Sequence, residues 1–360
     1  MSRPTKAIID LQALRNNFQL AQSLAPQSNT IAMVKANAYG HGAAEVSGAL
    51  ADIAPAFGVA CIEEALDLRA AGISNPILLL EGTFSANEVG TAAQHGFWLM
   101  VENHPQKEAI LTADISHPVQ VWLGVDTGMH RLGFEPAEIA EVYRILNASS
   151  NVSEQIVVSS HFASADDLDN QTTNKQIECF DACMPNNPNA LSSLANSAAI
   201  LAWPQAQRDW QRPGYMLYGC SPFVVAQKNA DQLQAVMSFE SAVISVRNIA
   251  VGESVGYTGN WTAERESTIA TITVGYGDGY PRHAPNGTPV LVNGLRCPLV
   301  GRVSMDMITV DVTDLPEVAI GAKVQLWGQV LPVNEVAQAC GTIGYELLTR
   351  MPARVPRIYR

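Results

Sequence analysis

Short apolar segments alternate with amphipathic segments along the first two thirds of the chain. The apolar segments have the length of buried strands, and the apolar positions between them recur at intervals of three and four, as on surface helices. The eight predicted strands are residues 31–34, 57–60, 77–80, 97–101, 119–123, 156–159, 191–194 and 216–217. Eight strand–helix units of this length predict an α/β fold, a (β/α)8 TIM barrel.

The ends of several predicted helices carry recognisable signals. Asp10 can cap a helix whose apolar face includes Leu14 and Phe18. Gly72 is placed to end the helix that follows the second strand. Pro136 is placed in the first turn of another helix. These signals support the helical assignment between the strands.

The pattern changes after the polar residues 227–232. Strands now follow one another without long helices, at residues 239–246, 268–274, 289–292, 298–300, 307–312 and 323–327, and short helical patterns occur at 333–339 and 345–351. Asn293 and Gly294, between two apolar segments, are typical of a type I′ hairpin. We therefore expect a barrel over residues 8–230 and a mostly-β domain over residues 231–360.

Composition narrows the class of protein. The 360 residues have a net charge of -12, and the acidic balance disfavours binding to nucleic acid or to an anionic membrane. The sequence shows neither a signal-peptide core nor an apolar segment long enough to span a bilayer. Its six cysteines lack the C-x-x-C spacing of metal or redox sites. These features predict a reduced, cytoplasmic protein without a bound metal.

Polar residues gather where the barrel strands end, which is where barrel enzymes place their active sites. Lys35 follows the first strand, although a lysine there could also be one that has just reached solvent. The others are Asp126 and Arg131 after the fifth strand, His161 and Asp166 after the sixth, Asn196 and Ser197 after the seventh, and Arg212, Gly214 and Tyr215 before the eighth. The small residues near the last two strands suit a phosphate group. A lysine, a phosphate site, two arginines and a histidine are what a Schiff-base cofactor with a phosphate group requires.

Seven motifs then carry a resemblance to a known family. In chain order they are VKANAYGHG, DTGMHRLGF, SHFASAD, RPGYMLYG, SVGYTG, GYGDGYPR and GRVSMDM. Together they resemble the pyridoxal-phosphate-dependent alanine racemases. The resemblance implies a homodimeric isomerase that interconverts L-alanine and D-alanine, either for peptidoglycan or for alanine breakdown.

The resemblance also implies two opposed acid–base groups. Lys35 would hold pyridoxal 5'-phosphate through a Schiff base and serve the D face of the substrate, and Tyr257 of the partner subunit would serve the L face. Racemisation removes a proton from one face of the α-carbon and returns one to the other, so two groups are needed. His161 and Arg212 resemble the hydrogen-bonded chain that stabilises the tyrosine. Arg212 would also face the pyridine nitrogen, which an arginine cannot protonate readily.

The remaining matched positions are implied to bind cofactor or substrate or to line the access corridor. The cofactor set adds Tyr39, Asn196, Ser197, Gly214 and Tyr215; the substrate set is Arg131 and Met305; the corridor and its surroundings hold Asp306, Tyr276, Arg282, Arg302 and Asp166.

The chain departs from the family pattern at Gly124 and Ala353. Many members carry at the first position a carbamylated lysine that orients the arginine matching Arg131, so we expect another anion there, a chloride or a nearby carboxylate. Some members carry at the second position a tyrosine that reaches the phosphate. These differences leave open a broader amino-acid racemase. A decarboxylase that shares the barrel and the β-domain is disfavoured by the paired Lys35 and Tyr257 motifs and by Arg212. A non-catalytic pyridoxal-phosphate carrier is disfavoured by the presence of Tyr257 and of the second domain.

Overall fold

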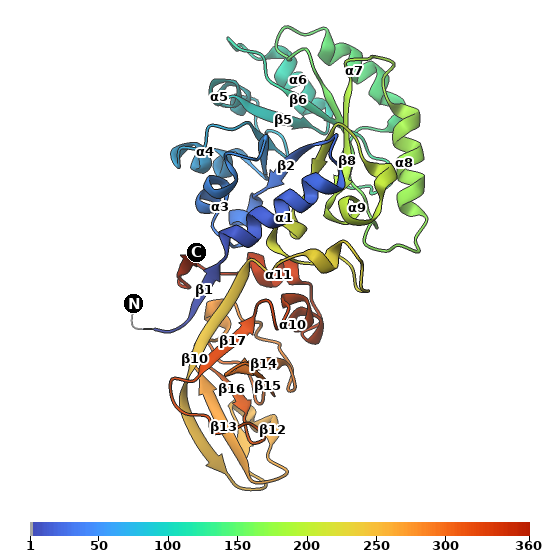
Figure 1. Cartoon of the computed structure of the whole chain (residues 1–360). Helices are drawn as coiled ribbons and strands as arrows, with labels where there is room; N and C mark the ends of the chain where they lie inside the picture. Colours follow the sequence, from blue (N-terminus) through green and yellow to red (C-terminus); the bar gives the residue numbers. More distant parts are fainter. Residues whose placement is uncertain (1–2) are drawn as a thin grey trace.

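The computed structural model describes residues 3–360, which form a barrel and, beside it, an elongated β-domain (Figure 1). Eight parallel strands close the barrel in chain order. They are β2 (Asn29–Met33), β3 (Ala56–Val59), β4 (Ile77–Leu79), β5 (Phe97–Val101), β6 (Val121–Gly124), β7 (Val157–Ser159), β8 (Leu191–Asn196) and β9 (Trp210–Arg212). The predicted (β/α)8 barrel is confirmed.

Helices surround the barrel because each buries one apolar face against the strands. They are α1 (Leu11–Leu24), α3 (Ala43–Leu50), α4 (Ile62–Ala70), α5 (Asn87–His95), α6 (His104–Thr112), α7 (Ile139–Asn147), α8 (Thr172–Cys183) and α9 (Ser197–Ala202). The short segment α2 (Lys35–Tyr39) is a left-handed turn and not a regular α-helix. Asp10 caps α1 as predicted, since its carboxylate accepts a hydrogen bond from the N–H of Ala13. Pro136 opens a single 3-10 turn directly before α7.

Three tryptophans fill the end of the barrel opposite the carboxyl ends of its strands. Trp98, Trp122 and Trp210 come from β5, β6 and β9, and their ring centroids lie 5.4 to 6.2 Å apart. Since β9 pairs only with β8 and β2, rings from these three strands can meet only in the barrel interior. The barrel is therefore packed at this end, and a ligand can approach only at the other.

The second domain is built on one sheet whose long strand β10 (Met237–Ile249) descends from the barrel (Figure 1). Its strand order is β15-β14-β17-β10-β1-β18, and β13 also pairs with β10 and in turn with β16. The strands are β1 (Lys6–Ile9), β13 (Ser267–Ile272), β14 (Pro289–Val292), β15 (Leu295–Pro298), β16 (Ile308–Asp311), β17 (Lys323–Trp327) and β18 (Arg357–Tyr359); β11 (Ser254–Val255) pairs with β12 (Trp261–Thr262), and the helices are α10 (Val333–Ala339) and α11 (Gly344–Thr349). The mostly-β character predicted for this domain is confirmed.

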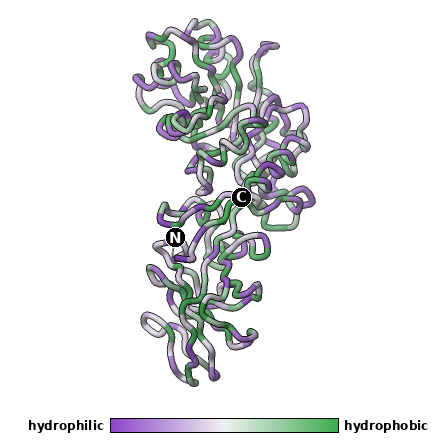
Figure 2. The backbone as a smooth tube through the Cα atoms, turned by 60° about the vertical axis from the view of Figure 1, so that its left-hand side comes forward, coloured by the Kyte–Doolittle hydropathy of each residue, from purple (hydrophilic) through white to green (hydrophobic). Residues whose placement is uncertain are grey.

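Segments far apart in the sequence meet at the junction of the two parts. Strand β1 pairs antiparallel with β10 and parallel with β18, so the first and last strands lie side by side in the second domain's sheet. Figure 2 shows hydrophobic stretches along the strands of both parts and hydrophilic stretches on many outer loops. Within residues 3–360, no helix has the length and apolarity needed to cross a bilayer.

Two predicted strands are wrong. The eighth barrel strand is β9, and the apolar residues 216–217 lie instead in a 3-10 turn, Tyr215–Tyr218. The sequence pattern did not predict β9 as a buried strand because two of its three residues, Gln211 and Arg212, are polar. The strand predicted at 298–300 is β15, which begins earlier because Asn293 and Gly294, both with positive φ, form a two-residue turn that pairs Val292 with Leu295.

Candidate active site

Lys35 stands at the open mouth of the barrel, two residues after β2 ends. The four residues that follow it, 36–39, all have φ between 52° and 54°, so this turn is left-handed. A left-handed turn of non-glycine residues costs about 1–2 kcal/mol per residue. It persists only where surrounding contacts hold it, and such strain is common at functional sites.

Side chains from three other places hold the turn. The carboxylate of Glu64 accepts the N–H of Ala36 at 2.7 Å. His41 lies 3.1 and 2.9 Å through Nδ1 from two carbonyl oxygens of the turn. Burial lowers the pKa of His41 to about 4, so the ring is neutral, and we assign its proton to Nδ1 because both neighbours are acceptors. Arg357 of β18 donates to the carbonyl of Gly40 at 2.8 Å.

The second domain also packs directly on this turn. A Cβ on Gly40 would lie 2.0 Å from the carbonyl oxygen of Leu348 in α11, and φ of Gly40 is +82°, so both space and conformation favour glycine. Tyr345 of α11 stacks on Tyr215 with centroids 3.6 Å apart and lies 6.2 Å from Tyr39. The barrel and the second domain therefore build this part of the site together.

Lys35 is half-buried among charged neighbours. Burial and the positive charges of Arg131 and Arg212 lower the pKa of its ammonium group, while Glu81 and Glu64 act in the opposite direction. A lowered pKa increases the fraction of free amine, which is the form that attacks a carbonyl or accepts a proton.

Ser197 and Gly214 form a small polar cradle beside Lys35. The hydroxyl oxygen of Ser197 accepts the N–H groups of Gly214 at 2.9 Å and Met216 at 3.3 Å. A Cβ on Gly214 would lie 2.5 Å from the Tyr39 hydroxyl, so a larger residue there would have to displace the Tyr39 ring. Asn196 caps α9, accepting the N–H of Ala199 at 3.1 Å. Hydroxyl groups and backbone N–H groups converge here, as a phosphate site requires.

Arg212, the last residue of β9, is buried without a carboxylate in contact. It donates to the hydroxyls of Ser159 at 3.0 Å and of Ser193, and to the carbonyls of Ser160 at 2.5 Å and Leu194 at 3.3 Å. Burial lowers its pKa to about 10, so the guanidinium stays charged at neutral pH. A cation held by neutral groups keeps its field available to a ligand.

His161 follows β7 and faces the open mouth of the barrel. Part of the His161 side chain is open to solvent at the mouth of the barrel. The ring nevertheless lies deep enough among protein atoms for burial to disfavour its charged form. This burial, followed by the charges of Arg212, Arg131 and Lys35, lowers the pKa of His161 to about 3. The imidazole is therefore neutral at physiological pH and can both donate and accept.

Arg131 lies in a loop that Asp126 organises. One carboxylate oxygen of Asp126 accepts the N–H groups of Gly128, Met129 and His130 at 2.9, 3.0 and 3.0 Å. Burial alone would raise the pKa of Asp126, but these bonds and His130 lower it. Arg131 is exposed and makes no ion pair within the described residues 3–360.

Glu102 is a member of this site that no motif singled out. It directly follows β5, and burial raises its pKa to about 7, although Arg212 and Arg131 pull the pKa down. Its position after a predicted strand was the one sequence signal that could have found it.

The remaining predicted residues do not join this cluster in one chain. Asp166 is exposed in the loop after β7. Tyr257, Tyr276, Arg282, Arg302, Met305 and Asp306 are exposed residues of the second domain. Tyr257 is 67% exposed between β11 and β12, and β12 lies in the second domain away from the barrel (Figure 1). A single chain therefore presents two separate halves of the predicted site.

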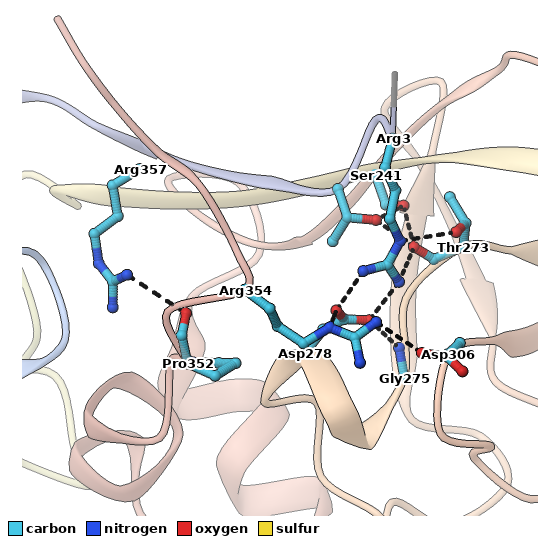
Figure 3. Close-up of polar contacts among 10 residues, drawn as sticks. Arg3, Ser241, Thr273, Gly275, Asp278, Asp306, Pro352, Arg354 and Arg357 are labelled. Carbon is cyan, nitrogen blue, oxygen red and sulfur yellow. Dashed lines mark hydrogen bonds and ion pairs between the residues drawn. The ribbon is translucent and has the colours of Figure 1, made fainter. Parts of the chain in front are cut away.

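A network of ion pairs fixes the loops that carry Tyr276 and Met305 (Figure 3). Asp278 is fully buried and accepts both terminal nitrogens of Arg3 at 2.6 Å, Nε of Arg354 at 3.0 Å and the N–H of Gly275 at 2.9 Å. Arg354 also donates to Asp306 at 2.7 Å. The network thus joins both ends of the described chain to the predicted substrate loop.

The fold and the cluster of Lys35, His161, Arg131 and Arg212 at one mouth define a barrel enzyme with its active site at the carboxyl ends of the strands. A family model described as alanine racemase, N-terminal domain, matches residues 9–222, and one described as alanine racemase, C-terminal domain, matches residues 236–359. The chain belongs to the alanine racemase family, and it is an enzyme of the isomerase class. The resemblance carried by the seven motifs is confirmed.

Relatives support this assignment over the whole length. The alanine racemase of Chromohalobacter salexigens is 51% identical over 360 residues, covering 100% of this chain and 99% of that protein. The crystal structure of the biosynthetic alanine racemase from Pseudomonas aeruginosa is 50% identical with a TM-score of 0.96, covering 99% of both chains. The alanine racemase from Bartonella henselae, solved with covalently bound pyridoxal phosphate, is 33% identical with a TM-score of 0.89, covering 99% of both chains.

Proposed function

We propose that this enzyme interconverts L-alanine and D-alanine with pyridoxal 5'-phosphate as its cofactor. The observation that carries the proposal is the braced left-handed turn, which presents an amine of lowered pKa at the barrel mouth. The residues around it fit the cofactor: Lys35 for its aldehyde, Ser197 with the N–H of Gly214 for its phosphate, and Arg212 for its ring nitrogen. When bound, the cofactor supplies an electron sink that acidifies the substrate α-carbon.

The chain's own residues supply binding and proton transfer. Arg131 binds the substrate carboxylate, and the backbone of Met305 faces the same group. Lys35 Nζ takes or returns the α-proton on the D face, and the Tyr257 hydroxyl does so on the L face. Neutral His161 and charged Arg212 stabilise the tyrosine through hydrogen bonding and charge.

The placement of Lys35 in the barrel and of Tyr257 in the second domain supports a homodimer with shared sites. Tyr257 is exposed on the second domain, beside further exposed apolar side chains of Tyr276, Met305 and Met307. Gly256 lies close to the backbone of Arg302, and Gly277 close to Met305, so these loops form one continuous surface. An exposed apolar surface of this kind favours a protein interface. In the proposed dimer this surface closes the partner's barrel mouth, with Arg282, Arg302, Asp306 and Asp166 along the corridor.

The direct test supplies the purified protein and cofactor with single amino acids and follows optical rotation. We expect exchange between L-alanine and D-alanine. Serine, lysine and arginine serve as comparisons, because Ala353 leaves space that a larger side chain could use. Turnover of lysine or arginine without alanine would contradict the proposal and favour the broader racemase.

Subunit mixing tests the shared site. Lys35→Ala and Tyr257→Phe are each expected to lack activity as homodimers. In a mixed dimer, one site combines both changes and the other combines the intact Lys35 and Tyr257. Equal mixing after dissociation should restore about a quarter of wild-type activity, because half the dimers are mixed and each has one intact site. No recovery, with mixed dimers shown to form, would mean that each chain supplies its own pair.

A further inference from the structure

The side chain of Glu102 occupies the space that a side chain at residue 124 would need. Strands β5 and β6 pair in parallel with Val101 opposite Leu123, so the next residues, Glu102 and Gly124, are neighbours. A Cβ on Gly124 would lie 1.9 Å from one carboxylate oxygen of Glu102 and 3.0 Å from the other. The φ of Gly124 is not positive, so the backbone does not require glycine there. The glycine provides space for the carboxylate.

The charges that act on Glu102 come from β9 and from the loop after β6. Arg212 on β9 and Arg131 in the loop after β6 favour its ionised form, while Asp126 in the same loop opposes it. Asp126 is already occupied by three N–H groups and by His130, so its oxygens are committed to the loop. Glu102 in turn is the carboxylate that supports the charge of buried Arg212. Of the two carboxylates Asp126 and Glu102, Glu102 is therefore the one left available to Arg131.

We propose that Glu102 is the positioning residue for Arg131, supplying from the space above Gly124 the negative charge that holds its guanidinium toward the substrate carboxylate. The inference rests on the proposed function, in which Arg131 binds that carboxylate. It commits to a carboxylate of the chain itself as the expected anion, in place of a bound chloride. Glu102 need not touch the substrate, because its effect passes through Arg131.

This arrangement makes the support of Arg131 dependent on pH. The pKa of Glu102 lies at about 7, so the carboxylate gains its charge across the neutral range. Below that range Arg131 loses its anion, and above it the support is complete. Lys35, His161 and the substrate amine also titrate or respond to pH, so the contribution of Glu102 must be measured as a ratio between two proteins.

The experiment compares Glu102→Gln holoenzyme with wild type. Glutamine keeps the size and removes the charge. We expect KM for both alanine enantiomers to rise about tenfold at pH 8, equivalent to about 1.4 kcal/mol, with a smaller change in kcat. The ratio of wild-type to variant kcat/KM should grow as pH rises through 7.

Inhibition by propionate, a carboxylate without an amine, should weaken by a similar factor. Calorimetric binding of propionate gives a readout independent of turnover.

Three controls separate the possible causes. Glu141→Gln removes an equal charge from the exposed face of α7 and should change nothing. Gly124→Ala should act like Glu102→Gln by displacing the carboxylate, and the double variant should be no worse than either. Replacing chloride by gluconate should leave wild type unaffected.

The proposal is overturned if Glu102→Gln keeps the wild-type KM and propionate affinity, or if wild type itself requires chloride. These outcomes differ from failure of the proposed function, which would appear as a wild-type protein without alanine exchange. Glu102→Asp, with a shorter side chain of the same charge, should recover part of the loss. Equal defects in the Asp and Gln variants would indicate a packing role and would also contradict the assignment.

Discussion

Arg212 and Asp278 are both buried charged residues, but the two domains surround them differently. Asp278 receives two arginines and a backbone N–H, so its charge is paired on every side. Arg212 donates hydrogen bonds to two hydroxyls and two carbonyls, and the charge of Glu102 supports it without contact. Paired charge stabilises a loop, whereas charge held by neutral groups remains available to a ligand. The surroundings of Asp278 are therefore those of a structural ion network, and the surroundings of Arg212 are those of a binding site.

Asp278→Asn should have the largest effect on stability. It leaves Arg3 and Arg354 facing a neutral group at a buried position, and breaking a buried ion pair typically costs about 3–5 kcal/mol. The free energy of unfolding in urea measures the loss. If unfolding is unchanged, the network of Figure 3 does not stabilise the second domain, and the contrast with Arg212 fails.

Arg212→Met should reduce activity strongly and stability only slightly, in contrast to Asp278→Asn. Removing the cation also removes the cost of burying it, so we expect the free energy of unfolding to fall by less than about 2 kcal/mol, the loss coming from carbonyls left unpaired. Activity should fall by more than about 10²-fold, as for other electrostatic groups in active sites. A stability loss as large as that of Asp278→Asn would show that Arg212 is mainly structural.

The smallest expected effect is the contribution of Glu102 to the pH dependence of the free energy of unfolding. Its pKa is near 4.5 in the unfolded chain and about 7 in the folded one, so folding favours the protonated form. The resulting stabilisation is complete below pH 4.5 and is lost as pH rises through 7. Between pH 5 and pH 8, wild type should lose about 1–2 kcal/mol relative to Glu102→Gln, allowing for solvent screening. Parallel urea curves at both pH values would contradict the raised pKa.

Local patterns predicted the elements well because their causes are local. The Asp10 cap, the Asn293–Gly294 turn and the apolar faces of α1 and α7 depend on residues a few positions apart. Strand β9 escaped prediction because its polar residues are buried only by partners from other strands. Arg212, for instance, finds Ser159 across 53 positions.

The site was predicted in part for the same reason. The strand pattern placed Lys35 and His161 after strands that the structure confirms, but it placed Arg212 before the eighth strand, and Arg212 is in fact the last residue of β9. Glu102 was missed because its neighbour on the adjacent strand, Gly124, has no side chain to suggest a contact. Arg3 and Asp278 are 275 residues apart, and no spacing rule connects them. Their roles stay predictions until the variants are measured.

The brace between Arg357 and Gly40 also sets an order of events during synthesis. The two residues are 317 positions apart. At about 5–20 residues added per second, roughly 15–60 seconds pass after Gly40 is made before Arg357 exists. During that interval the strained turn lacks the Arg357 bond and has only Glu64 and His41 to hold it, so a nascent chain does not yet present the Lys35 amine in its final setting. The reactive lysine is thereby installed late, when the rest of the enzyme is already there to enclose it.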